Sequence, residues 1–392
     1  MLPTWIVALI LLASVLVLLY QGAALWLAAQ MESLGPGAAP PPDPPTVAVV
    51  IAARNEATDL PATLDGLLAQ SYPTTEIVVV DGGSTDGTRE AIDARAPRVR
   101  RIDEPPLPSG WVGKNWGCAT GAEATRSEWI LFLDADVRLA PGALAALMDR
   151  ARATQSDLLT LAPKVEMVGF WERVVLPFMV QLILLYFRAP RMSRPNSRAA
   201  LVNGQCYLIR RSLYESVGGH RAIRGYVLED IALARNLKAA GARMRVVWAP
   251  ELATTRMYRD RDEMFEGLVK NIHGLRYSAA RQTGFLAGVI GFYYLPLFVL
   301  PLGLWAGNLL LIGIGGFLWV ALFGKHVGFA RAVGAPAAYG LLYPLAAGFY
   351  VALLTASLVD GLRGRPVQWK GRSYDRDAGP TPEGPLAPPT NR

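Results

Sequence analysis

Two carboxylates separated by one residue follow a short apolar run. The run covers residues 130–133, and the carboxylates are Asp134 and Asp136. Four apolar residues bounded by polar ones predict a buried strand. In an open α/β sheet, ligands bind just outside the carboxyl ends of the strands. Carboxylates at that place suit a hard divalent cation, which often accompanies a phosphate. A D-x-D pattern alone, however, is more often a solvated loop than a metal site.

Two further acidic sites recur along the chain. Asp81 opens D-G-G-S-T-D-G-T after an apolar run, and Glu229 and Asp230 begin a predicted helix. Asp81 could hydrogen-bond a nucleobase or ribose, and Asp136 could hold a cation that bridges two phosphates. Asp230 could take a proton from an attacking hydroxyl. Each motif taken singly is also an ordinary turn or helix start, but their occurrence together indicates one site.

Alternating strands and helices are predicted to position these carboxylates. Continuous apolar runs rich in β-branched residues predict strands that are covered on both faces. Such runs lie at 47–53, 76–80 and 130–133, and further strands are predicted at 99–102, 158–161 and 204–209, mostly with helices between them. This order predicts an α/β fold with a mostly parallel, doubly wound sheet. The strand ends share one edge, so Asp81 and the Asp134/Asp136 pair should converge there.

Several classes of function are excluded. No G-x-x-x-x-G-K-[ST] motif occurs, because Gly113-Lys114 is followed by Asn115, and no G-x-G-x-x-G follows the first strand. Lys114 could still neutralise phosphate charge, although a helix-surface lysine is the commoner outcome. No basic stripe with interleaved aromatic residues indicates nucleic acid. Cys118 and Cys206 lack metal-ligand spacing and are expected to be free thiols.

Apolar stretches predict that the chain spans a membrane. The hydrophobic fraction is 52% and the charged fraction 18%, an excess that a soluble domain does not need. Residues 5–29, 283–323 and 332–359 carry no charge. The middle stretch is roughly twice as long as one crossing requires, so it should turn near Gly307 and Asn308. We therefore expect about four transmembrane helices, the first an uncleaved anchor.

The sequence gives conflicting indications of which side of the membrane the two ends of the chain face. Basic residues just before the second crossing predict a cytoplasmic location for the preceding domain. Four crossings would then place the tail outside, although its own basic residues favour the inside. One segment, such as the last one with Pro344, could be re-entrant. A weaker apolar stretch at about 170–190 is either an interfacial helix in contact with the lipid bilayer or a buried core helix.

Four blocks together resemble the inverting family 2 glycosyltransferases. They are V-A-V-V-I-A-A-R-N-E, I-V-V-V-D-G-G-S-T-D-G-T, L-F-L-D-A-D and Y-V-L-E-D-I-A-L-A-R, in that family's order over residues 46–271. P-L-P-S-G-W-V-G-K-N-W-G, G-G-H-R-A-I-R and V-Q-W-K-G-R-S-Y are similar to a membrane-anchored branch. That branch contains hopanoid-associated and carotenoid lipid glycosyltransferases.

The resemblance implies a GT-A fold that binds a nucleotide-diphosphate sugar with Mg²⁺ or Mn²⁺. By this analogy Asp136 is the metal ligand, and Asp230 is the general base with Glu229 beside it. Asp81 would contact the nucleoside and Asp134 the ribose or sugar. The implied donor-binding residues are Ala53, Asn55, Glu56, Asp81, Lys114 and Asp134.

One departure from the family pattern affects the expected product. The processive members carry Q-x-x-R-W after the base, whereas this chain has M-F-E-G-L-V-K-N at 264–271. Transfer of a single sugar to a lipid is therefore favoured over polymerisation. Trp369, Lys370 and Arg372 could contact the diphosphate from the tail, although basic residues that flank a membrane helix are commonplace.

The expected organisation joins membrane segments to a cytoplasmic catalytic domain. The ranges are 1–30 for the anchor, 31–45 for a proline-rich linker, 46–281 for the GT-A domain, 282–360 for the C-terminal membrane region and 361–392 for the tail. The expected function is transfer of one sugar to a lipid acceptor, such as a hopanoid or carotenoid, at the cytoplasmic membrane face. A polyprenyl-phosphate glycosyltransferase and a non-catalytic membrane scaffold are the alternatives.

Overall fold

The computed structural model describes residues 2–37, 40, 43–73, 75–194, 197, 199–275, 277–365, 367–369 and 372–374. They divide into two compact units. The sheet unit contains residues 31–166 and 189–257, and the helical unit contains residues up to 30, residues 167–188 and residues from 258 onward. The expected catalytic domain, 46–281, therefore includes residues of both units.

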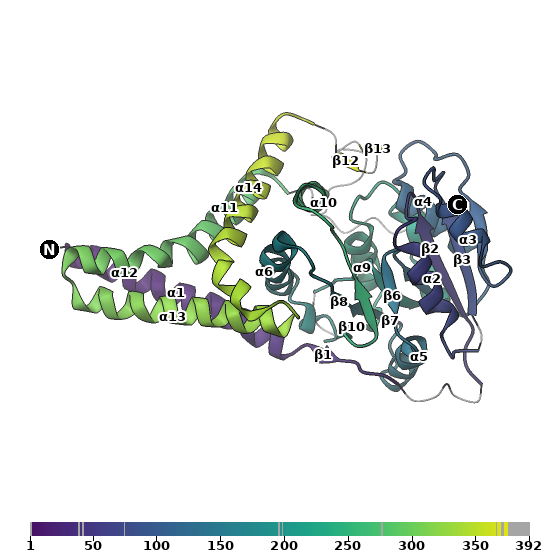
Figure 1. Ribbon diagram of the computed structural model, residues 1–392, viewed down its shortest axis with the longest axis horizontal. Helices are drawn as coiled ribbons and strands as arrows, with labels where there is room; N and C mark the ends of the chain where they lie inside the picture. The colour runs from purple at the N-terminus through teal and green to yellow at the C-terminus, as the bar shows by residue number, and fades with distance from the viewer. Residues whose placement is uncertain are drawn as a thin grey trace. The chain divides into compact units, whose positions relative to one another are not determined.

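An eight-stranded sheet forms the centre of the described part of the sheet unit (Figure 1). Its order is β1-β10-β7-β9-β5-β2-β3-β4. The strands are β1 (Glu32–Ser33), β2 (Val47–Ala53), β3 (Thr75–Asp81), β4 (Arg100–Asp103), β5 (Trp129–Leu133), β7 (Leu158–Ala162), β9 (Cys206–Arg210) and β10 (Met244–Trp248). Neighbours are parallel except at β9, which is antiparallel to both β5 and β7. The expected mostly parallel sheet is confirmed.

Helices cover both faces of this sheet. They are α2 (Leu60–Leu68), α3 (Thr88–Asp93), α4 (Gly113–Glu123), α5 (Ala143–Ala153), α7 (Arg211–Ser216), α8 (Gly219–Ala222) and α9 (Glu229–Ala239). Alternate residues of β2 point to opposite faces. Val49 shares a buried core with residues of α2 and α5. On the other face, a Cβ at Gly121 of α4 would lie 2.4 Å from Val50 Cγ1, so glycine permits this close packing.

A smaller sheet joins segments that lie far apart in the sequence. It contains β6 (Val137–Leu139), β8 (Lys164–Val165) and β11 (Ala253–Thr255). β11 pairs antiparallel with β6 and parallel with β8. This pairing brings Thr255 next to the residues that follow β5.

The helical unit is built from helices, most of which are apolar. They are α1 (Thr4–Ala29), α6 (Phe170–Phe187), α10 (Arg261–Gly274), α11 (Ala279–Val289), the π-helical η2 (Ile290–Tyr294), α12 (Leu295–Ala306), α13 (Leu309–Ala332), η3 (Ala337–Leu342) and α14 (Tyr343–Leu362). In the described residues, five helical segments are long and apolar enough to cross a membrane, counting α11–α12 and η3–α14 as one each. Four match the expected crossings, and the fifth is α6.

The predicted turn near Gly307 and Asn308 is confirmed. α12 ends at Ala306, and Gly307 adopts a left-handed conformation with φ 60°. The Asn308 side chain then accepts a hydrogen bond from the Leu311 backbone N–H at 3.1 Å and caps α13. α12 and α13 consequently form an antiparallel hairpin beside α1, while α14 runs across their direction (Figure 1).

The position of α6 in the chain limits what it can do. It is inserted between β8 and β9, and β7 and β9 are hydrogen-bonded neighbours in one sheet. Both ends of α6 therefore lead back to the same unit. It buries one face, including Val175 and Phe178, and exposes Phe170 and Ile183, a division that both expected interpretations allow.

Two adjacent glycines of α13 should respond differently to the same change. A Cβ at Gly315 would lie 2.4 Å from the Leu300 backbone N, whereas one at Gly316 would meet nothing within 4 Å. Gly315→Ala should destabilise the protein by about 1–3 kcal/mol, because α12 and α13 must separate. Gly316→Ala should be neutral or stabilising, because alanine favours helix. Thermal unfolding in detergent checks this, and equal effects of the two changes would contradict the hairpin packing.

Candidate active site

The ammonium group of Lys114 connects two of the predicted acidic sites. Its Nζ lies 2.7 Å from Asp134 Oδ1 and 2.8 Å from Glu229 Oε1. Lys114 belongs to the first turn of α4, Asp134 follows β5, and Glu229 begins α9. Burial lowers the pKa of Lys114, but the two carboxylates outweigh it and hold the pKa well above its ordinary value. A stable cation thus joins three elements at the sheet edge.

Asp230 lies in the first turn of α9, and its carboxylate accepts two backbone hydrogen bonds. Its Oδ1 accepts a hydrogen bond from the Ile231 backbone N–H at 2.8 Å, and its Oδ2 accepts one from the Gly204 backbone N–H at 3.2 Å. Burial and then the charge of Glu229 raise the pKa of Asp230 to about 7, against the opposing effect of Lys114. A carboxylate with this pKa can take up a proton near neutral pH.

Gly204 is a functional residue that the sequence reasoning missed. A Cβ there would lie 3.1 Å from both Asp230 Oδ2 and Glu229 Oε1. Its backbone N–H binds Asp230, and its carbonyl oxygen lies 3.5 Å from Lys114 Nζ. Any side chain at Gly204 would displace these carboxylates. The available signal was a glycine at the first residue of the strand expected at 204–209.

The carboxyl group of Asp136 lies in a partly buried position beside other acidic groups. Thr255 Oγ1 donates a hydrogen bond to its Oδ2 at 3.0 Å. Burial first, and then the charges of Asp134 and Glu56, raise the pKa of Asp136 to about 7. Among the described residues, Asp136 forms no ion pair. Thr255 was missed because only the pairing of β6 with β11 brings it here.

A metal site at Asp136 would need oxygen ligands from outside the protein. The residues that the structure describes contain no group of three or more His, Cys, Asp or Glu side chains able to hold a metal ion. Mg²⁺ is commonly held by one or two carboxylates together with substrate phosphates. The carboxyl group of Asp136 beside Asp134 fits that arrangement.

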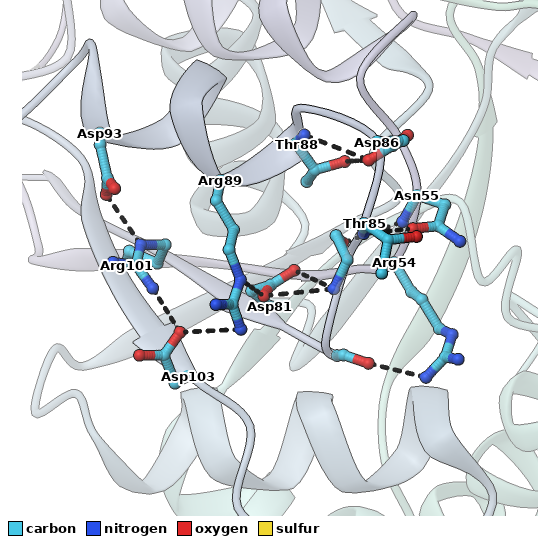
Figure 2. A network of polar contacts seen from close by, with 12 residues as sticks. Arg54, Asn55, Asp81, Thr85, Asp86, Thr88, Arg89, Asp93, Arg101 and Asp103 are labelled. Carbon is cyan, nitrogen blue, oxygen red and sulfur yellow. Dashed lines mark hydrogen bonds and ion pairs between the residues drawn. The ribbon is translucent and has the colours of Figure 1, made fainter.

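The Asp81 carboxylate organises the loop that follows β3. It is fully buried. It accepts hydrogen bonds from the Ser84 backbone N–H at 3.1 Å and from Arg89 Nε at 2.6 Å (Figure 2). Burial raises the pKa of Asp81, but these hydrogen bonds outweigh it and hold the pKa below its ordinary value. Arg89 was missed because an exposed helical arginine carries no distinguishing pattern.

The segment after β2 is tied to the same loop. Asn55 has a left-handed φ of 55°, which asparagine tolerates better than most residues. The bonds are Gly82 N–H to the Ala53 carbonyl at 2.8 Å, Asn55 N–H to Ser84 Oγ at 2.9 Å, Thr85 N–H to Asn55 Oδ1 at 3.0 Å, and Glu56 N–H to Thr88 Oγ1 at 2.8 Å. The two loops thus form one platform at the ends of adjacent strands (Figure 2).

The predicted site residues therefore fall into two groups. Lys114, Asp134, Glu229 and Asp230 are joined directly or through Gly204, with Asp136 two residues beyond Asp134. The residues at 53–56 and Asp81 form the loop platform. The tail residues belong to the helical unit, where the backbones of Trp369 and Arg372 pair across β12 (Val367–Trp369) and β13 (Arg372–Tyr374). The side chains of Trp369 and Arg372, and the whole of Lys370, lie outside the described residues.

Comparisons with known proteins show what the chain is similar to. The model of glycosyl transferase family 2 matches residues 48–218. A 4,4'-diaponeurosporenoate glycosyltransferase of Staphylococcus haemolyticus is 27% identical over 192 residues, which cover 48% of this chain and 51% of that protein. A protein of the same name from Staphylococcus aureus is 26% identical over 230 residues, covering 57% of this chain and 60% of its own. The alignments thus span between half and three fifths of these relatives.

One solved structure resembles most of the chain. It is the mannosyltransferase PcManGT of Pyrobaculum calidifontis, solved in complex with GDP-Man and Mn²⁺. The similarity has a TM-score of 0.53 at 19% identity, and it covers 91% of this chain and 97% of that one. At this identity the likeness concerns the fold, and the expected GT-A fold is confirmed.

The raised pKa of Asp136 predicts how stability depends on pH. Between about pH 4 and 7 the folded protein holds a proton that the unfolded chain has lost, so the free energy of unfolding should fall as pH rises. Asp136→Asn removes this proton and should flatten the decline. The measurement is urea unfolding with EDTA at several pH values.

Asp157→Asn is the matched control. The hydrogen bonds from Arg243 outweigh burial and lower the pKa of Asp157, so its contribution to stability is lost only as pH falls below about 4. It should leave the decline between pH 4 and 7 unchanged. An equal effect of both substitutions on that decline would contradict the environment described for Asp136.

Proposed function

We propose that the protein transfers one sugar from a nucleotide-diphosphate sugar to a lipid acceptor. The match of residues 48–218 to the model of glycosyl transferase family 2 supports this proposal. The observation that carries the proposal is Asp230, whose pKa is raised to about 7 at the start of α9, beside Glu229, which forms an ion pair with the cation Lys114. A base and a phosphate-compatible cation are the two groups that such a transfer requires.

Two observations support a lipid as the acceptor. The curated relatives are named for 4,4'-diaponeurosporenoate, a carotenoid. The helical unit of this chain also consists largely of helices long and apolar enough to cross a membrane. A carotenoid, hopanoid or similar amphiphile would be held in the membrane beside such helices.

The proposed step is an in-line displacement with inversion. Asp230 accepts the proton of the acceptor hydroxyl, and the hydroxyl oxygen attacks the anomeric carbon of the sugar. The bond between that carbon and the diphosphate oxygen breaks, and its electron pair leaves with the nucleoside diphosphate. Lys114 stabilises charge on the diphosphate, while Asp134 and the platform organised by Asp81 orient the donor.

The carboxylate oxygens at Asp136 fit a bound divalent cation. Asp136 would hold Mg²⁺ or Mn²⁺, with the donor diphosphate supplying further oxygens. When bound, the cation offsets negative charge that develops on the leaving diphosphate. Thr255 orients the Asp136 carboxylate by its hydrogen bond to Oδ2. Because Asp136 loses its proton only near pH 7, it should hold the cation best above that pH.

Substitution of Asp230 and Asp136 tests the proposed chemistry. Asp230→Asn removes the base and should lower transfer by about 10²–10⁴-fold, and Asp136→Asn should abolish the response to added Mn²⁺. The assay measures nucleoside diphosphate released by the purified full chain from a panel of UDP- and GDP-sugars, with extracted membrane lipids as acceptors. Asp93→Asn, which removes a surface ion pair with Arg101, should retain activity.

The outcomes separate the alternative functions. Retained activity in both Asp230→Asn and Asp136→Asn would refute the assignment. Activity that survives only in Asp230→Asn would favour a polyprenyl-phosphate acceptor, since a phosphate needs no strong base. Binding of a nucleotide sugar without turnover under any condition would indicate a non-catalytic scaffold.

We further infer three crossings with the sheet unit on the cytoplasmic side. α1 ends at Ala29, shortly before β1, and α10 begins six residues after β11. The C-terminal end of α1 and the N-terminal end of α10 are therefore close in sequence to the sheet unit. In this topology the segment α11–α12 crosses to the outer side of the membrane, and α13 crosses back to the cytoplasmic side. β12, directly after α14, contacts α10, which supports placing both ends of 337–362 on one side. The basic residues before α11 and after α14 then share the cytoplasmic side.

Cysteine accessibility tests this topology. Leu309, which is 84% exposed, begins α13, and Arg363 is exposed after α14. A membrane-impermeant maleimide added to intact cells should label Leu309→Cys but not Arg363→Cys, and disruption of the cells should expose the latter. The native Cys118 and Cys206 are buried and should not be labelled by the maleimide. Labelling of both positions from outside would instead indicate four crossings.

A further inference from the structure

The side chain of Asn115 is buried beside the candidate active site. Asn115 follows Lys114 in the first turn of α4 and is 0% exposed. Its Nδ2 donates to three backbone carbonyl oxygens, at 2.9 Å to Ile223, 3.1 Å to Arg224 and 3.0 Å to Tyr226. A side-chain amide has only two N–H bonds, so the three acceptors share them. One side chain thus binds a short stretch of backbone that lies just before α9.

The three carbonyl groups fix the orientation of this amide. In the flipped orientation, Asn115 Oδ1 would face three oxygens that can only accept hydrogen bonds. In the observed orientation, Oδ1 is buried and has no hydrogen-bond partner among the described residues. An unpartnered buried oxygen is costly, and an apolar side chain at this position would avoid that cost. The contribution that requires an asparagine is therefore its hydrogen bonding to the carbonyl groups.

Neighbouring residues of α4 hold the same part of the chain. The Val112 backbone N–H also donates to the Arg224 carbonyl oxygen, at 2.8 Å. Lys114 Nζ lies 2.8 Å from Glu229 Oε1. Val112, Lys114 and Asn115 therefore form a clamp, which we call the α4 clamp. It holds both the backbone before α9 and the first side chain of α9.

We propose that Asn115 is a positioning residue, which holds the start of α9 so that the Asp230 carboxylate meets the acceptor hydroxyl. This inference rests on the proposed function, in which Asp230 is the base. Asp230 directly follows Glu229, so its place depends on where the α4 clamp holds the helix. A misplacement of about 1 Å can lower a rate by about 100-fold. The donor contacts proposed at Asp81 and Asp134 come from other elements, so turnover should suffer more than donor binding.

Asn115→Ser tests this role, because it shortens the side chain and removes the amide. In the nucleoside diphosphate assay with the purified full chain, kcat should fall about 10- to 100-fold, while KM for the nucleotide sugar should stay within about twofold. Thr125→Val is the matched control. Thr125 is 1% exposed and donates to the Ala122 carbonyl at 3.0 Å, near the other end of α4. This variant should keep the wild-type kcat.

A double-mutant cycle separates positioning from general damage to the fold. In the Asp230→Asn background the base is already absent, so Asn115→Ser should cause little further loss of turnover. A merely structural effect would lower turnover by the same factor in both backgrounds. That result would overturn the proposal.

Hydrogen exchange tests the α4 clamp without any assay of activity. The backbone amides of 223–231 should exchange faster in Asn115→Ser than in the wild type, and Thr125→Val should leave them unchanged. Unchanged exchange in Asn115→Ser would refute the clamp. A wild type that depends on Asp230 together with a fully active Asn115→Ser would refute this inference alone. A wild type that transfers no sugar would refute the proposed function and the inference together.

Discussion

The contact between Lys114 and two carboxylates holds the site together. Without the cation, Asp134, Glu229 and Asp230 would place uncompensated negative charges close to one another in a poorly solvated region, which is costly. The contact also fixes distant parts of the chain against each other, since α4, the end of β5 and the start of α9 all meet at Nζ. The same cation opposes the rise in the pKa of Asp230 without cancelling it.

The central strands and the main acidic residues could be predicted because their signals are local. β2, β3 and β5 are continuous apolar runs, and each ends beside a candidate site residue. The antiparallel insertion of β9 could not be predicted, because an apolar strand does not specify its direction. Gly204 and Thr255 escaped notice for a related reason. Their importance arises from contacts between separate segments of the chain, 26 residues apart for Gly204 and Asp230 and 119 residues apart for Thr255 and Asp136.

The helical segments show a different limit of sequence reasoning. Length and apolarity identify α6 and α14 as well as they identify α13, although the chain around them differs. For α6, the strands on either side belong to one sheet, so both of its ends lead back to the sheet unit. Length and apolarity alone do not carry this information, because it comes from the pairing of strands that flank the helix.

The insertion of α6 has a consequence for how the protein can be divided. No continuous stretch of the chain corresponds to the sheet unit, which the chain leaves at Glu166 and re-enters at Ala189. The match to the family ends at residue 218, before β10, which lies between β1 and β7 in the sheet. A chain shortened to the matched region would lose an interior strand. The sheet unit can therefore be obtained on its own only by rejoining segments, not by trimming the ends.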